Sequence, residues 1–270
     1  MINYQPNFHH INLDWIYLSP HFDDVVLSCG GLVWEQTQAG HQVSIWTVCA
    51  GNPPDSALSP FAASLHARWN TGVESVNQRR LEDAASCARL GATHRHLSTL
   101  DCIYRLAPTE NLSQVEHSVF LYTTEASLFG PLHTTEARLI KSLSKELART
   151  LPPQAQVVCP LALGDHVDHQ LVRRAAERLD RPMLYYSDYP YVLESMDILE
   201  QMKRAGWSTI PHSISESGMV AWEEAVSTHT SQISTFWSDS TSMRTALRTF
   251  RQKMSGVLLW RSPQRNILKS

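Results

Sequence analysis

Trp15-Ile16-Tyr17-Leu18, followed closely by Pro20-His21-Phe22-Asp23-Asp24, is the stretch that decides how this chain folds. An apolar run of aromatic and aliphatic residues is typical of a buried strand, and the polar residues stand where that strand would end. A second stretch of this kind occurs later, where Val157-Val158-Cys159-Pro160-Leu161 precedes His166-Val167-Asp168-His169. In an open α/β sheet the carboxyl ends of neighbouring strands converge on one crevice, so we expect the two polar clusters to face each other there.

The composition indicates a folded chain with a sizeable core. Hydrophobic residues make up 43% of the 270 residues and charged residues 18%, which excludes a disordered chain. The formal net charge of -3 gives no electrostatic reason to expect nucleic acid as a partner. No apolar run reaches the roughly 18 residues that a membrane-spanning helix needs, so we expect no membrane span.

The N-terminus and the cysteines favour a cytoplasmic protein. Residues 1–6 lack the basic start and apolar centre of a secretory signal. The cysteines are odd in number and widely spaced, which argues against a disulfide framework and predicts buried thiols. They are Cys29, Cys49, Cys87, Cys102 and Cys159. The sequence does not distinguish a monomer from a homo-oligomer.

Strand-like runs alternate with helical patterns along the chain, as in a parallel sheet covered on both faces. Strands are expected at 15–18, 42–49, 94–97, 157–161 and 183–186, and helices at 24–38, 74–90, 136–149 and 169–179. Residues 51–56 are expected to form a loop, and 104–132 lack periodicity, which favours an insertion that shapes a substrate pocket. The remainder is expected to be helical with one or two strands.

The predicted fold is therefore α/β and Rossmann-like, with a mostly parallel sheet, helices on both faces and a metal site at the carboxyl ends of the strands. We expect a single domain over residues 1–270, in which the portion from about residue 190 shapes the substrate site.

The two polar clusters carry the ligand types of a hydrolytic metal site. His21, Asp24 and His169 supply two imidazoles and one carboxylate, the number of protein ligands that leaves one position for water. Asp23 would then be free to accept a proton from that water.

The second cluster offers two further catalytic groups. His166 precedes His169 by three residues and could reach the other side of a reacting carbonyl. Asp168 could orient His166 by accepting its ring N–H, which fixes the tautomer of the histidine.

Each cluster has a simpler interpretation when taken alone. Asp23 and Asp24 could be a helix N-cap with a neighbouring solvated charge, and the His-x-Asp-His stretch could be a hydrogen-bonded loop. The presence of both clusters at strand ends favours the metal site.

The two motifs together resemble those of the PIG-L or LmbE-like family of zinc-dependent N-acetylglucosaminyl deacetylases. The family's Pro-His-x-Asp-Asp motif and the glycine pair after it correspond to residues 20–24 with Gly30 and Gly31, and its His-x-Asp-His motif corresponds to residues 166–169. Phe22 stands where the family usually has proline, a position that does not ligate metal. The resemblance extends over about residues 13 to 240 and includes the stretch 187–191 and the Ser231-Gln232 pair.

The resemblance implies zinc as the metal, although two imidazoles and a carboxylate would also hold Fe²⁺ or another first-row ion. It also implies that Arg79 contacts the substrate and that Asp101, after the next strand, belongs to the site. Both residues have simpler alternatives. Arg79 could pair with Glu82 or Asp83 on a solvated helix face, and Asp101 could cap the following turn.

The function that the resemblance implies is removal of the N-acetyl group from an N-acetylglucosamine-type amino sugar or its conjugate. Zinc would activate a water, Asp23 would act as general base, and His166 would help to stabilise the tetrahedral oxyanion. A relative that cleaves a larger thiol-sugar conjugate or antibiotic intermediate is the alternative. A binding module without activity is a further alternative, disfavoured because a mere metal-holding scaffold needs no extra base.

The remaining histidines and tryptophans are assigned to structure. The histidines without paired ligand spacing are expected at the surface or in ordinary hydrogen bonds; they are His94, His96, His117, His133 and His229. The tryptophans are expected to pack in the core, although Trp69 could line a pocket; they are Trp46, Trp69, Trp222 and Trp237.

Overall fold

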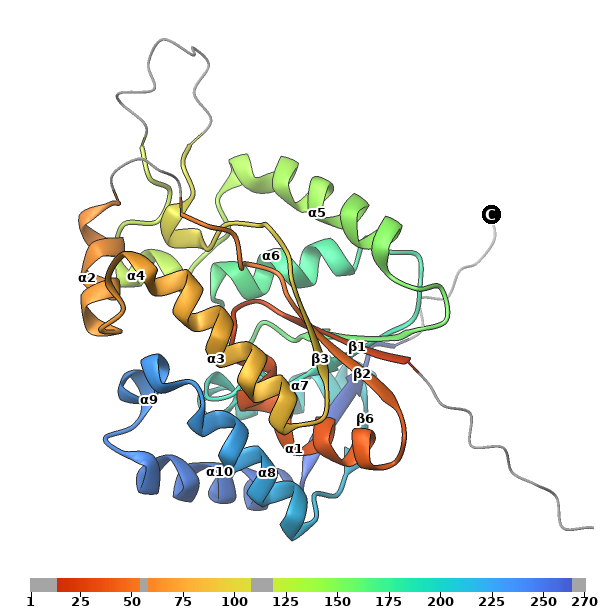
Figure 1. Ribbon diagram of the computed structural model, residues 1–270. Helices are drawn as coiled ribbons and strands as arrows, with labels where there is room; N and C mark the ends of the chain where they lie inside the picture. Colours follow the sequence, from red (N-terminus) through yellow and green to blue (C-terminus); the bar gives the residue numbers. More distant parts are fainter. Residues whose placement is uncertain (1–13, 54–57, 108–118, 264–270) are drawn as a thin grey trace, which may run out of the picture.

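The computed structural model in Figure 1 describes residues 14–53, 58–107 and 119–263. Some expectations fall outside these described residues: those on residues 1–6, on 54–56 of the expected loop 51–56, on His117, and on 108–118 of the stretch 104–132. Within them a seven-stranded sheet has the order β3-β2-β1-β4-β5-β7-β6. The strands are β1 (Asp14–Ser19), β2 (Gln42–Thr47), β3 (Thr93–His96), β4 (Gln156–Pro160), β5 (Met183–Tyr186), β6 (Ser208–His212) and β7 (Val257–Arg261).

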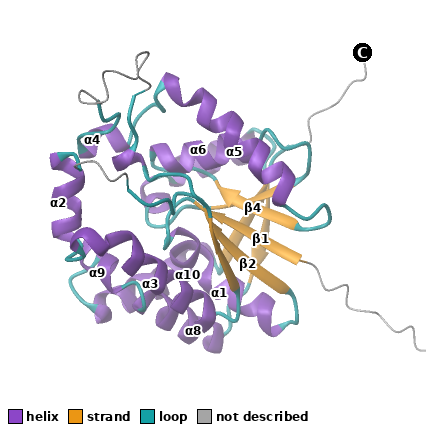
Figure 2. Ribbon diagram, turned by 45° about the horizontal axis from the view of Figure 1, so that its top comes forward, coloured by secondary structure: helices purple, strands orange, loops and turns teal. Residues whose placement is uncertain are grey.

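The sheet is mostly parallel. The strands β1 to β5 pair in parallel, and only β7 runs antiparallel to its neighbours β5 and β6. Helices cover both faces: in Figure 2, α5 (Ala137–Thr150) and α6 (Val167–Ala176) lie above the sheet, and α1 (Asp24–Gln38), α3 (Ser75–Arg89), α8 (Glu216–Ser227) and α10 (Ser240–Met254) lie below it. The predicted α/β, Rossmann-like fold is confirmed.

Four shorter helices surround the entrance to the site or extend the C-terminal part. They are α2 (Pro60–Arg68), α4 (Glu125–Leu128), α7 (Met196–Arg204) and α9 (Thr230–Phe236). The sequence patterns did not predict α2. Ser59 caps it by accepting a hydrogen bond from the Ala62 N–H at 3.0 Å, and Pro60 occupies the first turn, where a missing N–H costs nothing.

Helix α1 is buried between the sheet and α8, and its glycine pair makes this possible. A Cβ at Gly30 would lie 2.4 Å from Trp222 Cδ1, and one at Gly31 would lie 2.8 Å from Ile214 Cγ2. Trp222 is fully buried and donates its ring N–H to the Val26 carbonyl at 2.6 Å. Larger residues at these two positions would force α8 away from α1, which is the usual cost of overpacking a dense core.

The apolar strands of the sheet form the centre of the core. Tyr17, Leu18 and Val158 are fully buried, as expected for parallel strands covered on both faces. All five cysteines are free and buried, which confirms the prediction of buried thiols. Among the described helices, none has the length and apolar character required to cross a membrane.

The strand order changes direction between β1 and β4, which is where an open α/β sheet forms its binding crevice. Tyr17 pairs with Ile45 of β2 on one side and with Val158 of β4 on the other. The two strands that carry the polar motifs are therefore neighbours, and their carboxyl ends open on the same side of the sheet.

Candidate metal centre

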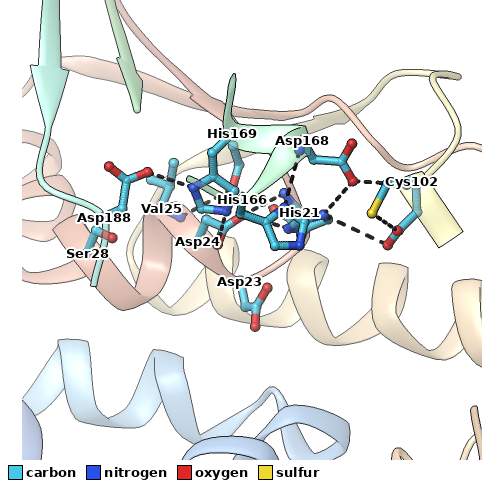
Figure 3. Close-up of polar contacts among 12 residues, drawn as sticks. His21, Asp23, Asp24, Val25, Ser28, Cys102, His166, Asp168, His169 and Asp188 are labelled. Carbon is cyan, nitrogen blue, oxygen red and sulfur yellow. Dashed lines mark hydrogen bonds and ion pairs between the residues drawn. The ribbon is translucent and has the colours of Figure 1, made fainter. Parts of the chain in front are cut away.

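The two motifs meet at the carboxyl ends of β1 and β4. The Asp24 carboxylate lies between two imidazoles: its Oδ2 is 3.1 Å from His21 Nδ1, and its Oδ1 is 3.2 Å from His169 Nε2. His166 lies on the same side, and ligand atoms of the three histidines are within 4.8 Å of one another. Figure 3 shows these side chains converging from the two segments, with Asp23 beside them. The expectation that the clusters face each other is confirmed.

The turn from β1 into α1 fixes the first motif. Ser19 Oγ donates to the His21 carbonyl at 2.6 Å and accepts the Val25 N–H at 3.2 Å, which closes the turn. Asp24 Oδ2 also accepts the His21 N–H at 2.7 Å. Asp23 occupies the N-cap position of α1, as the simpler interpretation expected, but its side chain makes no capping bond. The neighbouring Asp24 is buried, so it is not the solvated charge of that interpretation.

A carboxylate holds His169 from behind. Asp188, which follows β5, has its Oδ1 2.6 Å from His169 Nδ1 and accepts the Leu163 N–H at 3.1 Å. Burial by itself lowers the pKa of His169, but the carboxylates of Asp24 and Asp188 outweigh it and raise this pKa to about 9. No individual role was expected for Asp188, although its position at the end of a third parallel strand was a usable signal.

A second carboxylate holds His21, and here one prediction is wrong. Asp168 was expected to accept the ring N–H of His166, but its Oδ2 lies 2.9 Å from His21 Nε2. His166 is instead the N-cap residue of α6, and its Nδ1 accepts the backbone N–H of Asp168 at 3.2 Å. Since a helix start needs acceptors for its free N–H groups, the ring of His166 is held by the backbone and not by the carboxylate.

His166 is held as a neutral hydrogen-bond donor. Burial, together with the nearby His21 and His169, keeps the pKa of His166 well below its ordinary value. Because Nδ1 accepts a hydrogen bond, the proton of the neutral ring resides on Nε2. Phe129 packs edge-on against this ring, with the centroids 5.2 Å apart.

Arg79 lies inside the site and not on a solvated helix face. Its side chain is 7% exposed, its Nη2 is 3.5 Å from Asp23 Oδ1, and its guanidinium stacks on Trp69 at 4.9 Å. Glu82 and Asp83, the suggested alternative partners, contact other residues: Glu82 accepts from Ser231 Oγ at 2.6 Å, and Asp83 lies 2.7 Å from His96 Nε2. Asp101 caps the following turn, as the alternative foresaw, since its Oδ1 accepts the Ile103 N–H at 3.2 Å. It also lines the site pocket.

The pocket at this centre has a volume of about 280 Å³, a polar floor and aromatic walls. Its floor includes His21, Asp23, Asp24, Arg79, Asp101 and His166. The walls come from Trp69 near the end of α2, Phe129 after α4, Tyr191, and Phe236 of α9. Trp69 thus lines the pocket, which was the alternative to packing in the core for this residue. Trp46, Trp222 and Trp237 pack against the core.

Of the histidines assigned to structure, three of the four that lie within the described residues follow expectation. His94 is exposed, His96 contacts Asp83 at 2.7 Å, and His133 contacts Thr135 at 2.8 Å. His229 is 1% exposed, and neither of its ring nitrogens has a hydrogen-bond partner among the described residues. The expectation of a surface or hydrogen-bonded histidine is wrong for His229, because the spacing of histidines in the sequence does not reveal which of them is buried.

The donor set fits a divalent metal ion. His169 Nε2 is buried without a hydrogen-bond partner in the described part of the chain and faces Asp24 Oδ1. A buried ring nitrogen without a hydrogen-bond partner destabilises the fold, unless a metal ion accepts its lone pair or an acceptor takes its N–H. Two imidazoles, each held on its far nitrogen by a carboxylate, are arranged as histidines that ligate metals usually are.

Comparison with known proteins gives related enzymes along most of the chain. A 2'-N-acetylparomamine deacetylase of Niallia circulans is 32% identical over 210 residues, which cover 72% of this chain and 71% of the relative. The enzyme of the same description from Streptomyces fradiae is 27% identical over 212 residues, covering 76% and 68%. A solved structure of a deacetylase from the teicoplanin biosynthesis pathway has 25% identity and a TM-score of 0.74, covering 93% of this chain and all of that one.

The PIG-L family model, described as GlcNAc-PI de-N-acetylase, matches residues 16–179. This match runs from β1 through α6 and contains both polar motifs together with Arg79 and Asp101. The chain belongs to the PIG-L family of deacetylases.

Proposed function

We propose that this chain is a metal-dependent hydrolase that removes the N-acetyl group from an amino sugar or an amino-sugar conjugate. The observation that carries the proposal is the position of Asp24 between His21 and His169, with Asp23 beside this group on the pocket floor. The two curated relatives are deacetylases of an acetylated amino sugar, which supports the same reaction class here.

His21 Nδ1, the Asp24 carboxylate and His169 Nε2 would hold the ion. Zinc is the metal we propose, and Fe²⁺ suits the same donors. When bound, such an ion acidifies water toward neutrality and polarises a carbonyl oxygen. Asp168 and Asp188 hold the far nitrogens of the two histidines, so both ligating nitrogens are fixed toward Asp24.

Asp23 and His166 carry out the proton chemistry. Asp23 takes the proton from the attacking water, and Arg79 holds its carboxylate in place from 3.5 Å. His166 donates its Nε2–H to the oxyanion that develops as the amide carbonyl becomes tetrahedral. Because the low pKa of His166 leaves little imidazolium, we assign delivery of a proton to the departing amine to Asp23.

The substrate groups away from the amide contact the pocket walls. We propose that Arg79 and Asp101 bind the sugar and that Trp69 stacks against it, since all three line the pocket. Tyr191, Gln232 and Phe236 also line it, which supports a substrate-shaping role for the portion from about residue 190 within a single domain over 1–270.

A larger acylated glycoconjugate is the second candidate substrate. The similarity to a teicoplanin-pathway deacetylase along 93% of this chain favours it. The aromatic walls suit an extended acyl chain or a second ring as well as a single sugar.

A screen of amine release, combined with metal analysis, tests the proposal. The purified chain is loaded with zinc and given N-acetylglucosamine, 2'-N-acetylparomamine and their long-chain N-acyl analogues, with the Asp23→Asn variant as the inactive control. Release of amine from an acetylated sugar at a rate that depends on Asp23 is the expected result. Stoichiometric metal without amine release from any N-acylated sugar would overturn the assignment.

A further inference from the structure

A line of buried charged groups leads away from His21 on the side opposite Asp24. The carboxylate of Asp168 is fully buried and contacts His21 Nε2 through one oxygen and the Arg105 guanidinium through the other. Arg105 in turn lies 2.5 Å from Glu136 through its Nε. Tyr122 completes the line by donating its hydroxyl to Glu136 at 2.5 Å. Arg105, Glu136 and Tyr122 belong to neither motif.

Asp168 needs a cation because water does not reach it. A fully buried carboxylate is strongly disfavoured unless it is paired and hydrogen-bonded. The Cys102 N–H adds a hydrogen bond at 3.0 Å to the same oxygen that contacts His21. Arg105 contacts one oxygen of Asp168, and His21 and the Cys102 N–H contact the other, so the orientation of the carboxylate is fixed.

Arg105 is itself fixed in several directions. It is 5% exposed, and the Nη1 that contacts Asp168 also donates to the Leu100 carbonyl at 3.1 Å. Its guanidinium lies over the ring of Tyr122, 5.4 Å from the centroid. A planar guanidinium can satisfy these partners at once, whereas a lysine ammonium is a single point charge.

We propose that Arg105 is a positioning residue for the metal centre and acts through Asp168. The guanidinium holds the carboxylate so that it accepts the Nε2–H of His21, and this leaves His21 Nδ1 as the nitrogen available to a metal ion. Glu136 and Tyr122 hold the guanidinium in turn. This inference rests on the metal site of the proposed function and adds the stretch around residue 105 to the groups that determine metal affinity.

Zinc affinity, measured by competition with a chromogenic chelator, tests the role without any substrate. Arg105→Lys keeps a positive charge beside Asp168 and so limits the loss of folding that a neutral residue would cause. We expect it to bind zinc about 10-fold more weakly, at the lower end of the effect of removing a group that orients a metal ligand. Arg105→Met should weaken binding further.

Arg173→Lys is a matched control. Arg173 also pairs with a glutamate, Glu177, at 2.8 Å, donates to the Leu161 carbonyl at 2.6 Å and lies over Tyr185 at 5.5 Å. Its side chain resembles that of Arg105 in bonding, although it is more exposed, at 28% against 6%. Arg173 lies one turn after His169 on α6, but its side chain makes no hydrogen bond or ion pair with the proposed ligands or their carboxylates in the described structure. The control should lose stability in urea while its zinc affinity stays within about two-fold of the parent.

A double-mutant cycle distinguishes positioning of Asp168 by Arg105 from a general loss of structural stability. If Arg105 acts through Asp168, then Arg105→Lys combined with Asp168→Asn should bind zinc no more weakly than Asp168→Asn alone. Losses that simply add, or an Arg105→Lys variant with the zinc affinity of the parent, would overturn the inference. If the parent binds no zinc, or binds it independently of His21, the proposed function itself fails, and the two failures are thereby distinguished.

Discussion

The two histidines that flank Asp24 are held in the same way but in different electrostatic surroundings. Asp168 contacts His21 at 2.9 Å, and Asp188 contacts His169 at 2.6 Å. Asp168 is paired with the buried Arg105, and its pKa is held well below the usual range. No guanidinium contacts Asp188 among the described residues, and burial raises its pKa despite the hydrogen bond with His169.

The difference shows that a carboxylate can orient an imidazole in two ways. It can depend on a charged side chain from a distant part of the sequence, or only on groups near the neighbouring strand end. Asp168, which contacts His21, is paired with Arg105 from the stretch after β3, a stretch far from either motif in the sequence. The His169 side uses the adjacent strand end and one backbone N–H, which Leu163 donates to Asp188. We therefore expect the His21 side to be more sensitive to changes elsewhere in the chain.

Removal of either histidine should have the largest effect, and it should be equal on the two sides. His21→Ala or His169→Ala leaves two protein ligands of the proposed three, which is too few to hold the ion firmly. We expect loss of bound metal after dialysis and loss of measurable deacetylation. Elemental analysis beside an amine-release assay checks this. A His169→Ala protein with near-stoichiometric metal and normal turnover would show that the ligand set is different.

Asp23→Asn should have the next largest effect and should leave both histidine sides intact. The variant keeps the three proposed ligands but loses the general base, so kcat should fall by about 10²–10⁴-fold with the metal content unchanged. Asp24→Asn, the neighbouring control, should lose metal first. If the two variants behave the opposite way, the roles of the two aspartates are exchanged.

The third prediction tests the comparison directly. Asp168→Asn and Asp188→Asn should each weaken zinc binding by about 10–100-fold, since each carboxylate contacts a histidine that we propose as a ligand. Only Asp168→Asn removes one of the two carboxylates that contact a buried guanidinium. Breaking a buried ion pair costs up to about 3–5 kcal/mol of stability. Urea denaturation of the metal-free variants should therefore show a much lower midpoint for Asp168→Asn. Equal midpoints would mean that the pairing with Arg105 contributes little.

The sequence was informative where chemistry and secondary structure coincide. The strand-to-helix turns at residues 20–24 and 166–169 combine an apolar run with histidines and aspartates, so the fold and the convergence of these side chains could both be predicted. Arg105 and Asp188 were not predicted because their roles depend on partners 63 and 19 residues away. The wrong prediction for Asp168 has the same cause. Its spacing from His166 suggested a local partner, but the carboxylate contacts His21, which is 147 residues away.

The smallest effect we predict is a pH dependence of the metal-free protein. Folding raises the pKa of His169 from about 6.5 to about 9, because the carboxylates of Asp24 and Asp188 outweigh burial. The folded state then holds a proton more tightly than the unfolded chain, so this stabilisation is complete below pH 6.5 and disappears as the pH rises through about 9. In urea with a chelator present, the midpoint should fall over this range, and less so in His169→Gln. A midpoint that rises with pH, or an equal fall in the variant, would contradict a charged His169 between two carboxylates.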